Sequence, residues 1–192
     1  MELHIYDFDG TLFRSPDEPS WWSKTGKGYW WTSSESLGRP CVPDHPDSSW
    51  WISSVVSQAK KSIADPDVIT IMCSGRSDVG SNRYRIPELF KQIGLHFDAV
   101  YLGKNSNIKA QKAAIAANYQ KKYPEINTVH MWDDTKSNRD AVRNATIKLG
   151  HFFIGHPVRV PPKEPLCTFE TYMETEKDPA IKLATRWVEK KG

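Results

Sequence analysis

Short apolar runs alternate with helix-length segments along most of the chain, and this alternation constrains the fold more than any other feature. The first run begins at residue 3, and the others cover residues 68–73, 97–102, 127–132 and 151–154. Helices are expected at about 50–61, 86–93, 108–122 (with Asn107 as its cap) and 137–149. Strands that alternate with helices form a parallel sheet covered on both faces. The sequence therefore predicts an α/β, Rossmann-like fold with a parallel sheet of about five strands.

Two segments do not follow this alternation. Residues 14–60 carry five prolines and six of the eight tryptophans, the latter as three adjacent pairs. We interpret them as an irregular, cap-like insert after the first strand, with most tryptophans in a core and a minority free to stack on bases. Residues 156–192 predict a proline-rich extension and a terminal helix that starts near Asp178-Pro179 and docks on the body. The remaining core spans residues 1–155.

Polar residues follow three of the predicted strands. Asp7 and Asp9 come after the first, Ser74-Gly75-Arg76 after the second, and Asp133-Asp134 after the fourth. Sites in parallel sheets form beyond the carboxyl ends of the strands, so these groups are expected to meet at one edge. Two residues apart on extended backbone, Asp7 and Asp9 project to the same side. Their repulsion requires a divalent cation or a shared proton between them.

Together these groups resemble four motifs of the haloacid dehalogenase-like (HAD) phosphohydrolases. The motifs are Asp7-x-Asp9-Gly10-Thr11, Ser74-Gly75-Arg76, a lysine at a helix start, and Asp133-Asp134, in that order. Within that superfamily, residues 7–16, the Trp-rich insert and Trp132-Asp133-Asp134 are similar to the HAD domain of Swiss Army Knife RNA repair proteins. The likeness to polynucleotide phosphatases is looser.

The resemblance implies a division of labour among the acids. Asp7 would be the nucleophile that forms an aspartyl phosphate, and Asp9 the general acid and later the base. Mg²⁺ would be held by Asp7, by the backbone carbonyl of Asp9, and by Asp133 or Asp134. The sequence does not separate the roles of these last two residues.

Phosphate-binding groups follow from the same resemblance. They are Thr11, Ser74, the N–H of Gly75 and a lysine, for which Lys109 is the first choice and Lys104 the alternative. Arg76, Arg83 and Arg85 form a basic group after the second motif. They are expected either to contact further phosphates of the substrate or to be a solvated face.

The expected function is that of a Mg²⁺-dependent phosphomonoesterase acting on terminal phosphates of nucleic acid. A nucleotidase or small-molecule phosphatase is the alternative, and a phosphate-binding module without activity is a third possibility. The net charge of +3 is too small to indicate nucleic acid by itself. No P-loop motif is present, which argues against a kinase activity on this chain.

The cysteines and the apolar segments suggest an intracellular protein. Cys41, Cys73 and Cys167 are odd in number and far apart in sequence, which favours unpaired thiols in a reducing compartment such as the cytoplasm. No run approaches the length of a membrane span, and no secretory signal is recognised. The sequence leaves the oligomeric state open.

Overall fold

A five-stranded parallel sheet forms the centre of the computed structural model, which describes residues 1–104 and 106–177. The strands are β1 (Glu2–Tyr6), β2 (Val68–Ser77), β3 (Ala99–Gly103), β4 (Thr128–Asp133) and β5 (Phe152–Pro157), in the spatial order β3-β2-β1-β4-β5. The α/β prediction is confirmed. Strand order reverses between β1 and β4, so the crevice beyond their carboxyl ends is the expected place for a site.

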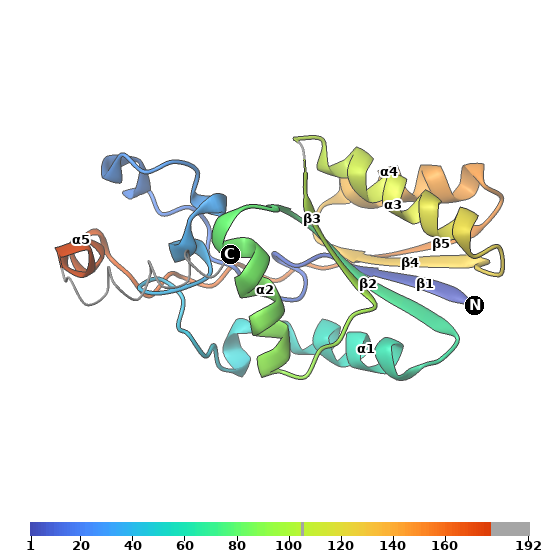
Figure 1. Ribbon diagram of the computed structural model, residues 1–192, viewed down its shortest axis with the longest axis horizontal. Coiled ribbons are helices and arrows are strands. Elements are labelled where there is room, and N and C mark those ends of the chain that lie inside the picture. Colours follow the sequence, from blue (N-terminus) through green and yellow to red (C-terminus); the bar gives the residue numbers. More distant parts are fainter. Residues whose placement is uncertain (105, 178–192) are drawn as a thin grey trace.

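Helices cover both faces of the sheet (Figure 1). Helices α1 (Ser53–Ala64) and α2 (Gly80–Gln92) lie on one face, and α3 (Ile108–Lys122) and α4 (Lys136–Lys148) lie on the other. Because side chains alternate along a strand, β1 serves two cores. Leu3 and Ile5 pack toward α3 and α4, whereas Tyr6 packs toward α1 and α2. Asp7 follows in the same alternation and faces α3.

Three elements differ most from the sequence prediction. Strand β2 continues to Ser77, so Ser74-Gly75-Arg76 lies inside a strand and not after it. Helix α2 starts six residues before the predicted position, because its first turns are polar and carry no apolar signal. The helix expected from residue 50 is divided into a 3-10 turn (Ser48–Trp50) and α1. The break occurs because the N–H of Ile52 donates to the carbonyl of Leu12.

The insert after β1 is built from short 3-10 turns and aromatic packing. The turns are η1 (Trp22–Thr25), η2 (Trp30–Thr32), η3 (Ser34–Ser36) and η4 (Ser48–Trp50). The prediction that most tryptophans of this segment are core residues is confirmed, since four of the six are buried. These are Trp22, Trp30, Trp50 and Trp51.

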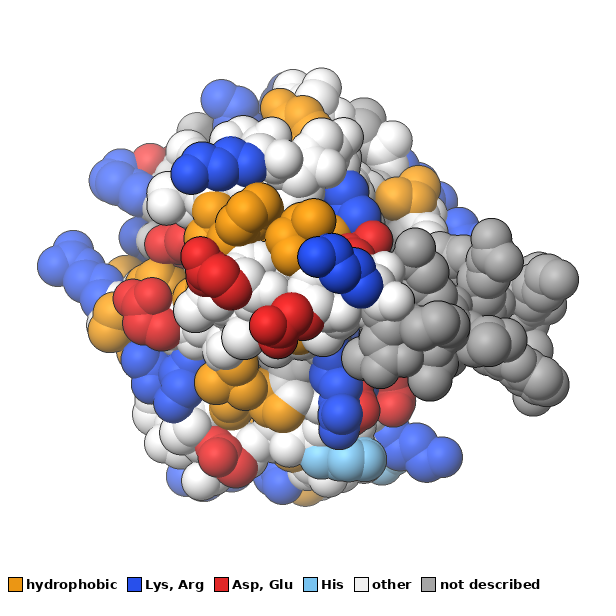
Figure 2. Space-filling view, turned by 90° about the vertical axis from the view of Figure 1, so that its left-hand side faces the viewer, with side chains coloured by type: hydrophobic (Ala, Val, Ile, Leu, Met, Phe, Trp, Pro, Cys, Tyr) orange, Lys and Arg blue, Asp and Glu red, His pale blue; other side chains and the backbone are white. Residues whose placement is uncertain are grey.

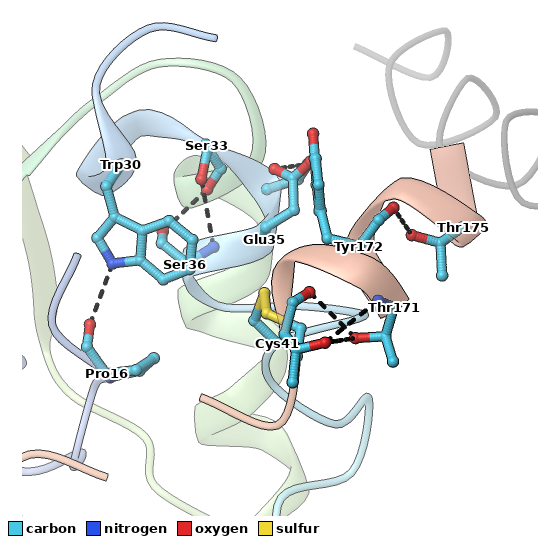
Figure 3. The surroundings of a disulfide bond; sticks show 12 residues. Pro16, Trp30, Ser33, Glu35, Ser36, Cys41, Thr171, Tyr172 and Thr175 are labelled. Atoms are coloured by element: carbon cyan, nitrogen blue, oxygen red, sulfur yellow. Dashed lines mark hydrogen bonds between the residues drawn. A yellow bond between two sulfur atoms is a disulfide. The ribbon is translucent and has the colours of Figure 1, made fainter. Parts of the chain in front are cut away.

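The segment after β5 folds back along the insert. Helix α5 (Phe169–Lys177), which the sequence did not predict, places Tyr172 against Trp21 and Trp22. A disulfide joins Cys41 of the insert to Cys167, just before α5 (Figure 3). The helix predicted from Asp178 lies outside the described residues.

The expectation of three unpaired thiols is therefore wrong. Cys41 and Cys167 are 126 residues apart in sequence, but their Cα atoms lie 4.5 Å apart. Cys73 remains free and is buried in β2. The inference of a reducing compartment depended on unpaired cysteines and loses that basis. Within residues 1–104 and 106–177, no helix has both the length and the apolar composition of a membrane span.

Candidate active site

A buried lysine joins two aspartates at the carboxyl edge of the sheet. Nζ of Lys112 lies 2.7 Å from Oδ1 of Asp7 and 2.6 Å from Oδ2 of Asp133. Asp7 follows β1 and Asp133 ends β4, so the parallel pairing of these strands brings both acids to the same place. All three side chains are at least nine-tenths buried. Charges in such surroundings are tolerated only when they are paired.

The lysine of this cluster is neither of the two that the sequence analysis considered. Lys109 is exposed and does not line the cleft described below, and Lys104 is exposed at the cleft rim. Lys112 lies on the buried stripe of α3 with Ala116 and Gln120, at spacings of four. Helical side chains lean toward the N-terminus, so a lysine just after the first turn reaches the sheet edge.

Burial and neighbouring charges perturb both partners of this pair. The pKa of Asp7 is raised to about 8, mainly by burial. The Lys112 ammonium group opposes this rise, and the Asp133 carboxylate adds to it. Burial also opposes the charge on Lys112, but the two carboxylates raise its pKa above the ordinary value. The pocket thus holds a permanent cation beside an acid that resists ionisation, and a second cation would relieve that resistance.

Asp9 is held by groups from β2 and from the insert. Nε of Arg76 donates to both carboxylate oxygens, at 2.8 and 3.0 Å, and Oγ of Ser15 donates to Oδ1 at 2.5 Å. Oγ of Ser74 lies 3.5 Å from the other oxygen. Arg76 also donates to Ser36 and packs over the ring of Trp31. The orientation of Asp9 is therefore coupled to the insert.

Asp134 is positioned by the turn that follows β1. Its backbone N–H donates to Oγ1 of Thr11 at 3.1 Å, so Thr11 supports an acid, which the sequence analysis did not anticipate. Gly10 has φ +65°, and a Cβ there would lie 2.7 Å from Oδ2 of Asp134. Glycine is required for both the backbone angle and the space. Burial raises the pKa of Asp134.

Asp133 is held by residues that follow it in sequence, at the start of α4. It accepts from the N–H of Thr135 at 2.8 Å and from Nδ2 of Asn138 at 3.2 Å, in addition to Lys112. Asn138, Ser15 and Lys112 are the site residues that the sequence analysis missed. Asn138 lies in the first turn of the helix predicted over residues 137–149, and nothing in that pattern indicated a contact with Asp133.

An open cleft of about 1160 Å³ lies over these acids. The pairing of β2 with β3 shifts register between Cys73 and Ser77, and the extra residues turn Gly75 and Arg76 toward the cleft. Ser74 is buried beneath them. The insert contributes Tyr29 and Trp31, and the α3 side contributes Lys104, Ile108 and Lys112.

Two of the three arginines proposed for substrate contacts lie elsewhere. Arg83 is exposed and pairs with Asp78. Arg85 donates to the carbonyls of Leu37, Pro43 and Asp44, so it fastens the insert to α2. Neither lines the cleft, whereas Arg76 does.

The acids at this edge fit a divalent cation. Ligand oxygens of Asp7, Asp133 and Asp134 lie within 4.8 Å of one another. With Asp9 they would carry four negative charges when ionised, against the two positive charges of Lys112 and Arg76. The remaining charge equals that of one divalent ion, and carboxylate oxygens are the ligands that Mg²⁺ prefers.

Comparison with known proteins agrees with this architecture. Residues 20–160, nearly three quarters of the chain, match the family described as HAD domain family 1 in Swiss Army Knife RNA repair proteins. Asp7 and Asp9 precede the matched range, so the acids after β1 are identified by the geometry above.

Two solved structures share the fold at low sequence identity, and a third is a weaker match. The HAD domain of effector protein Lem4 from Legionella pneumophila is 14% identical with a TM-score of 0.52, over 90% of this chain and 92% of that one. A structure of an inactive mutant of the same domain is 14% identical with a TM-score of 0.50, over 95% of this chain and 97% of that one. A chain of the Pnkp1/Rnl/Hen1 RNA repair complex is 15% identical with a TM-score of 0.46, over 81% of this chain and 42% of that one.

Proposed function

We propose that this chain, which belongs to HAD domain family 1 of the Swiss Army Knife RNA repair proteins, is a Mg²⁺-dependent phosphomonoesterase that removes terminal phosphates from nucleic acid. The observation that carries the proposal is the Asp7–Lys112–Asp133 cluster under an open cleft, with Asp9 two residues from Asp7. Phosphoryl transfer needs an in-line nucleophile, positive charge on the phosphoryl oxygens and a proton for the leaving group. In this proposal Asp7 is the nucleophile, Lys112 supplies the positive charge and Asp9 supplies the proton.

Asp7 is the nucleophile in this proposal. Its carboxylate oxygen attacks phosphorus, the bond to the leaving oxygen breaks, and Asp9 gives that oxygen a proton. Water then attacks the aspartyl phosphate, Asp9 takes up a proton from it, and phosphate leaves with Asp7 restored. Arg76 and Ser15 keep the carboxyl of Asp9 in place through both halves.

Lys112, Ser74 and the N–H of Gly75 are proposed to hold the phosphoryl oxygens. Asp133 orients Lys112, while Asp134 faces the cleft. Mg²⁺ held by Asp7, Asp133 and Asp134 would neutralise charge on the transferring group. Asp9 remains available for this ion through its backbone carbonyl, as the resemblance implies.

The substrate class rests on the cleft rim and on the family. Tyr29 is 78% exposed at the rim, where its ring can stack on a base, and Lys104 can contact a backbone phosphate. Figure 2 shows the end that carries the insert and α5, where Lys, Arg, Asp and Glu side chains are interspersed on the described part. That mixture of charges favours contact with the end of a nucleic-acid strand over binding along the length of a strand, which needs a continuous basic surface.

Hydrolysis of aryl and alkyl phosphates with Mg²⁺ tests the chemistry. We expect Asp7→Asn to lose on the order of 10³-fold or more in kcat. In kcat/KM, which reports the attack by Asp7 and not the later hydrolysis of the aspartyl phosphate, Asp9→Asn should lose about 10²–10⁴-fold on an alkyl phosphate, whose leaving group needs a proton, and much less on p-nitrophenyl phosphate. A wild-type protein inert on both substrates across divalent metals and pH would support the non-catalytic binding module instead.

A substrate panel tests the second part of the proposal. It compares 3′- and 5′-phosphorylated oligonucleotides with mononucleotides, for the wild type and for Tyr29→Ala. The loss of one stacked base should raise KM for the oligonucleotide about 10-fold and leave p-nitrophenyl phosphate unchanged. Tyr84→Ala, at an exposed tyrosine of α2 that does not line the cleft, is the matched control. A preference for mononucleotides in the wild type, unaffected by Tyr29→Ala, would favour a nucleotidase.

A further inference from the structure

A second group of ligand atoms lies on the α1 face of the sheet, away from the acids of the cleft. Glu2 and His4 of β1 and His130 of β4 place one carboxylate oxygen and two imidazole nitrogens within 4.8 Å of one another. His4 and His130 are register partners in the parallel pair. Asp7 follows His4 by three residues, about 10 Å along the strand, and faces the opposite side.

The spacing of these atoms suits a tetrahedral ion. Oε2 of Glu2 lies 2.8 Å from Nε2 of His4 and 3.5 Å from Nε2 of His130. Ligands at 2.0–2.1 Å around Zn²⁺ are about 3.3 Å from one another. The side chain of Glu2 is 42% exposed, so an ion and a fourth ligand from solvent can reach the group.

Each histidine has a partner on its other ring nitrogen. Nδ1 of His4 lies 2.7 Å from Oγ of Ser62 in α1, and Nδ1 of His130 lies 3.0 Å from Nε2 of His156 in β5. Metal-binding histidines typically have such a second partner, which fixes the ring and leaves the inner nitrogen for the ion.

Ser62 fixes the ring of His4 through the nitrogen that faces away from Glu2. Its hydroxyl lies 2.7 Å from Nδ1 of His4, 3.1 Å from the carbonyl of Gln58 and 2.8 Å from the hydroxyl of Tyr6. In the tautomer in which Nδ1 donates to Ser62, the lone pair of Nε2 faces the carboxylate of Glu2 and can bind a cation between them.

We propose that Glu2, His4 and His130 bind a divalent transition ion of the Zn²⁺ type, separate from the Mg²⁺ site and independent of the phosphatase proposal. Two imidazoles with one carboxylate favour Zn²⁺ over Mg²⁺, which prefers oxygen ligands. The ion would link β1 to β4, the two strands that carry Asp7 and Asp133. It would therefore stabilise the central strand pair without touching the substrate.

Isothermal titration with Zn²⁺ tests this site, using the full chain without a histidine tag, stripped with EDTA and returned to excess Mg²⁺. Excess Mg²⁺ competes for the carboxylate cluster and so suppresses Zn²⁺ binding there. We expect one Zn²⁺ per chain, with affinity reduced at least 100-fold in Glu2→Gln and in His130→Gln. Ser62→Ala should reduce it about 10- to 100-fold, as is usual for a second partner.

His96→Gln, at an exposed histidine outside the group, is the matched control and should bind as the wild type does. Co²⁺ replaces Zn²⁺ in a second measurement, where visible absorption bands of a tetrahedral site should appear and be lost in His130→Gln. Three results would overturn the proposal: no Zn²⁺ bound in excess Mg²⁺, binding unchanged by Glu2→Gln and His130→Gln, or binding reduced equally by His96→Gln. None of them bears on phosphatase activity.

Discussion

Replacing Lys112 by methionine tests the central ion pair directly. The Lys112 side chain is 3% exposed, and its ammonium group contacts two carboxylates at 2.7 and 2.6 Å. Methionine fills much of the same volume but leaves Asp7 and Asp133 buried without their cation. Removal of one partner of a buried ion pair costs about 3–5 kcal/mol. At about 2–4 °C per kcal/mol for a chain of this size, the melting temperature in EDTA should fall by about 6–20 °C.

Acid and Mg²⁺ should each reduce this loss. Without Lys112, the pKa of Asp7 lies even further above the ordinary value, because the group that lowers it is gone. A raised pKa contributes stability that is present at low pH and lost as pH rises through the folded value. Lys112→Met should therefore be closest to the wild type in acid and furthest from it above pH 8. Saturating Mg²⁺ supplies positive charge and should recover part of the loss.

Lys109→Met is the matched control, one turn earlier on the same helix. Its side chain is exposed, so melting should change by no more than about 2 °C and phosphatase activity should be retained. Differential scanning fluorimetry and p-nitrophenyl phosphate turnover measure both quantities. The reasoning is refuted if Lys112→Met melts within 2 °C of the wild type in EDTA, or if Lys109→Met loses activity and Lys112→Met does not.

Three further perturbations follow from the site and from the insert. Asp7→Asn removes the acid whose pKa is raised to about 8, so in EDTA the wild type should lose stability relative to the variant by about 1.4 kcal/mol per pH unit between pH 4 and 8. Chemical denaturation at each pH measures this difference in stability, and a difference independent of pH would contradict the prediction. Gly10→Ala pushes a methyl group against Asp134 and should raise the Mg²⁺ concentration for half-maximal activity about 10-fold or more, which a Mg²⁺ titration checks; an unchanged midpoint would show that Asp134 tolerates the methyl. Cys41→Ser with Cys167→Ser opens a loop of 126 residues and should cost about 4–5 kcal/mol in urea denaturation, whereas Cys73→Ala, which breaks no bond, should cost less; equal losses would argue against the cross-link as the cause.

The sheet could be predicted from the sequence because each strand is a short apolar run followed by polar or turn-forming residues. Asn107 was recognised as a cap because its side-chain oxygen accepts from the N–H of Ala110, as the rule for helix starts requires. The acids were found for a related reason, since parallel strands bring their carboxyl ends to one edge. Patterns of this kind depend on residues that are close in sequence, and packing between distant segments does not change what they predict.

The features that were missed depend on packing between distant segments. Helix α3 is rich in alanine, which fits any face, so periodicity did not show that Lys112 and not Lys109 points inward. Arg85 looked like a phosphate ligand, but its donors are used by carbonyls of the insert. The partner of Cys41 lies beyond the whole sheet, in a segment whose own pattern indicated only an extended linker.

The native disulfide also requires that Cys41 does not pair with Cys73, which is nearer in sequence than Cys167. On the ribosome, Cys41 and Cys73 are both made long before Cys167, so a premature bond between the first two is the competing product. All five strands precede Cys167, and once they pair, Cys73 is enclosed in β2, where burial raises its pKa to about 12. Its thiolate, the reactive form, is then scarce. Pairing of the strands thus protects Cys73 from disulfide formation and leaves Cys41 and Cys167 as the two thiols that join.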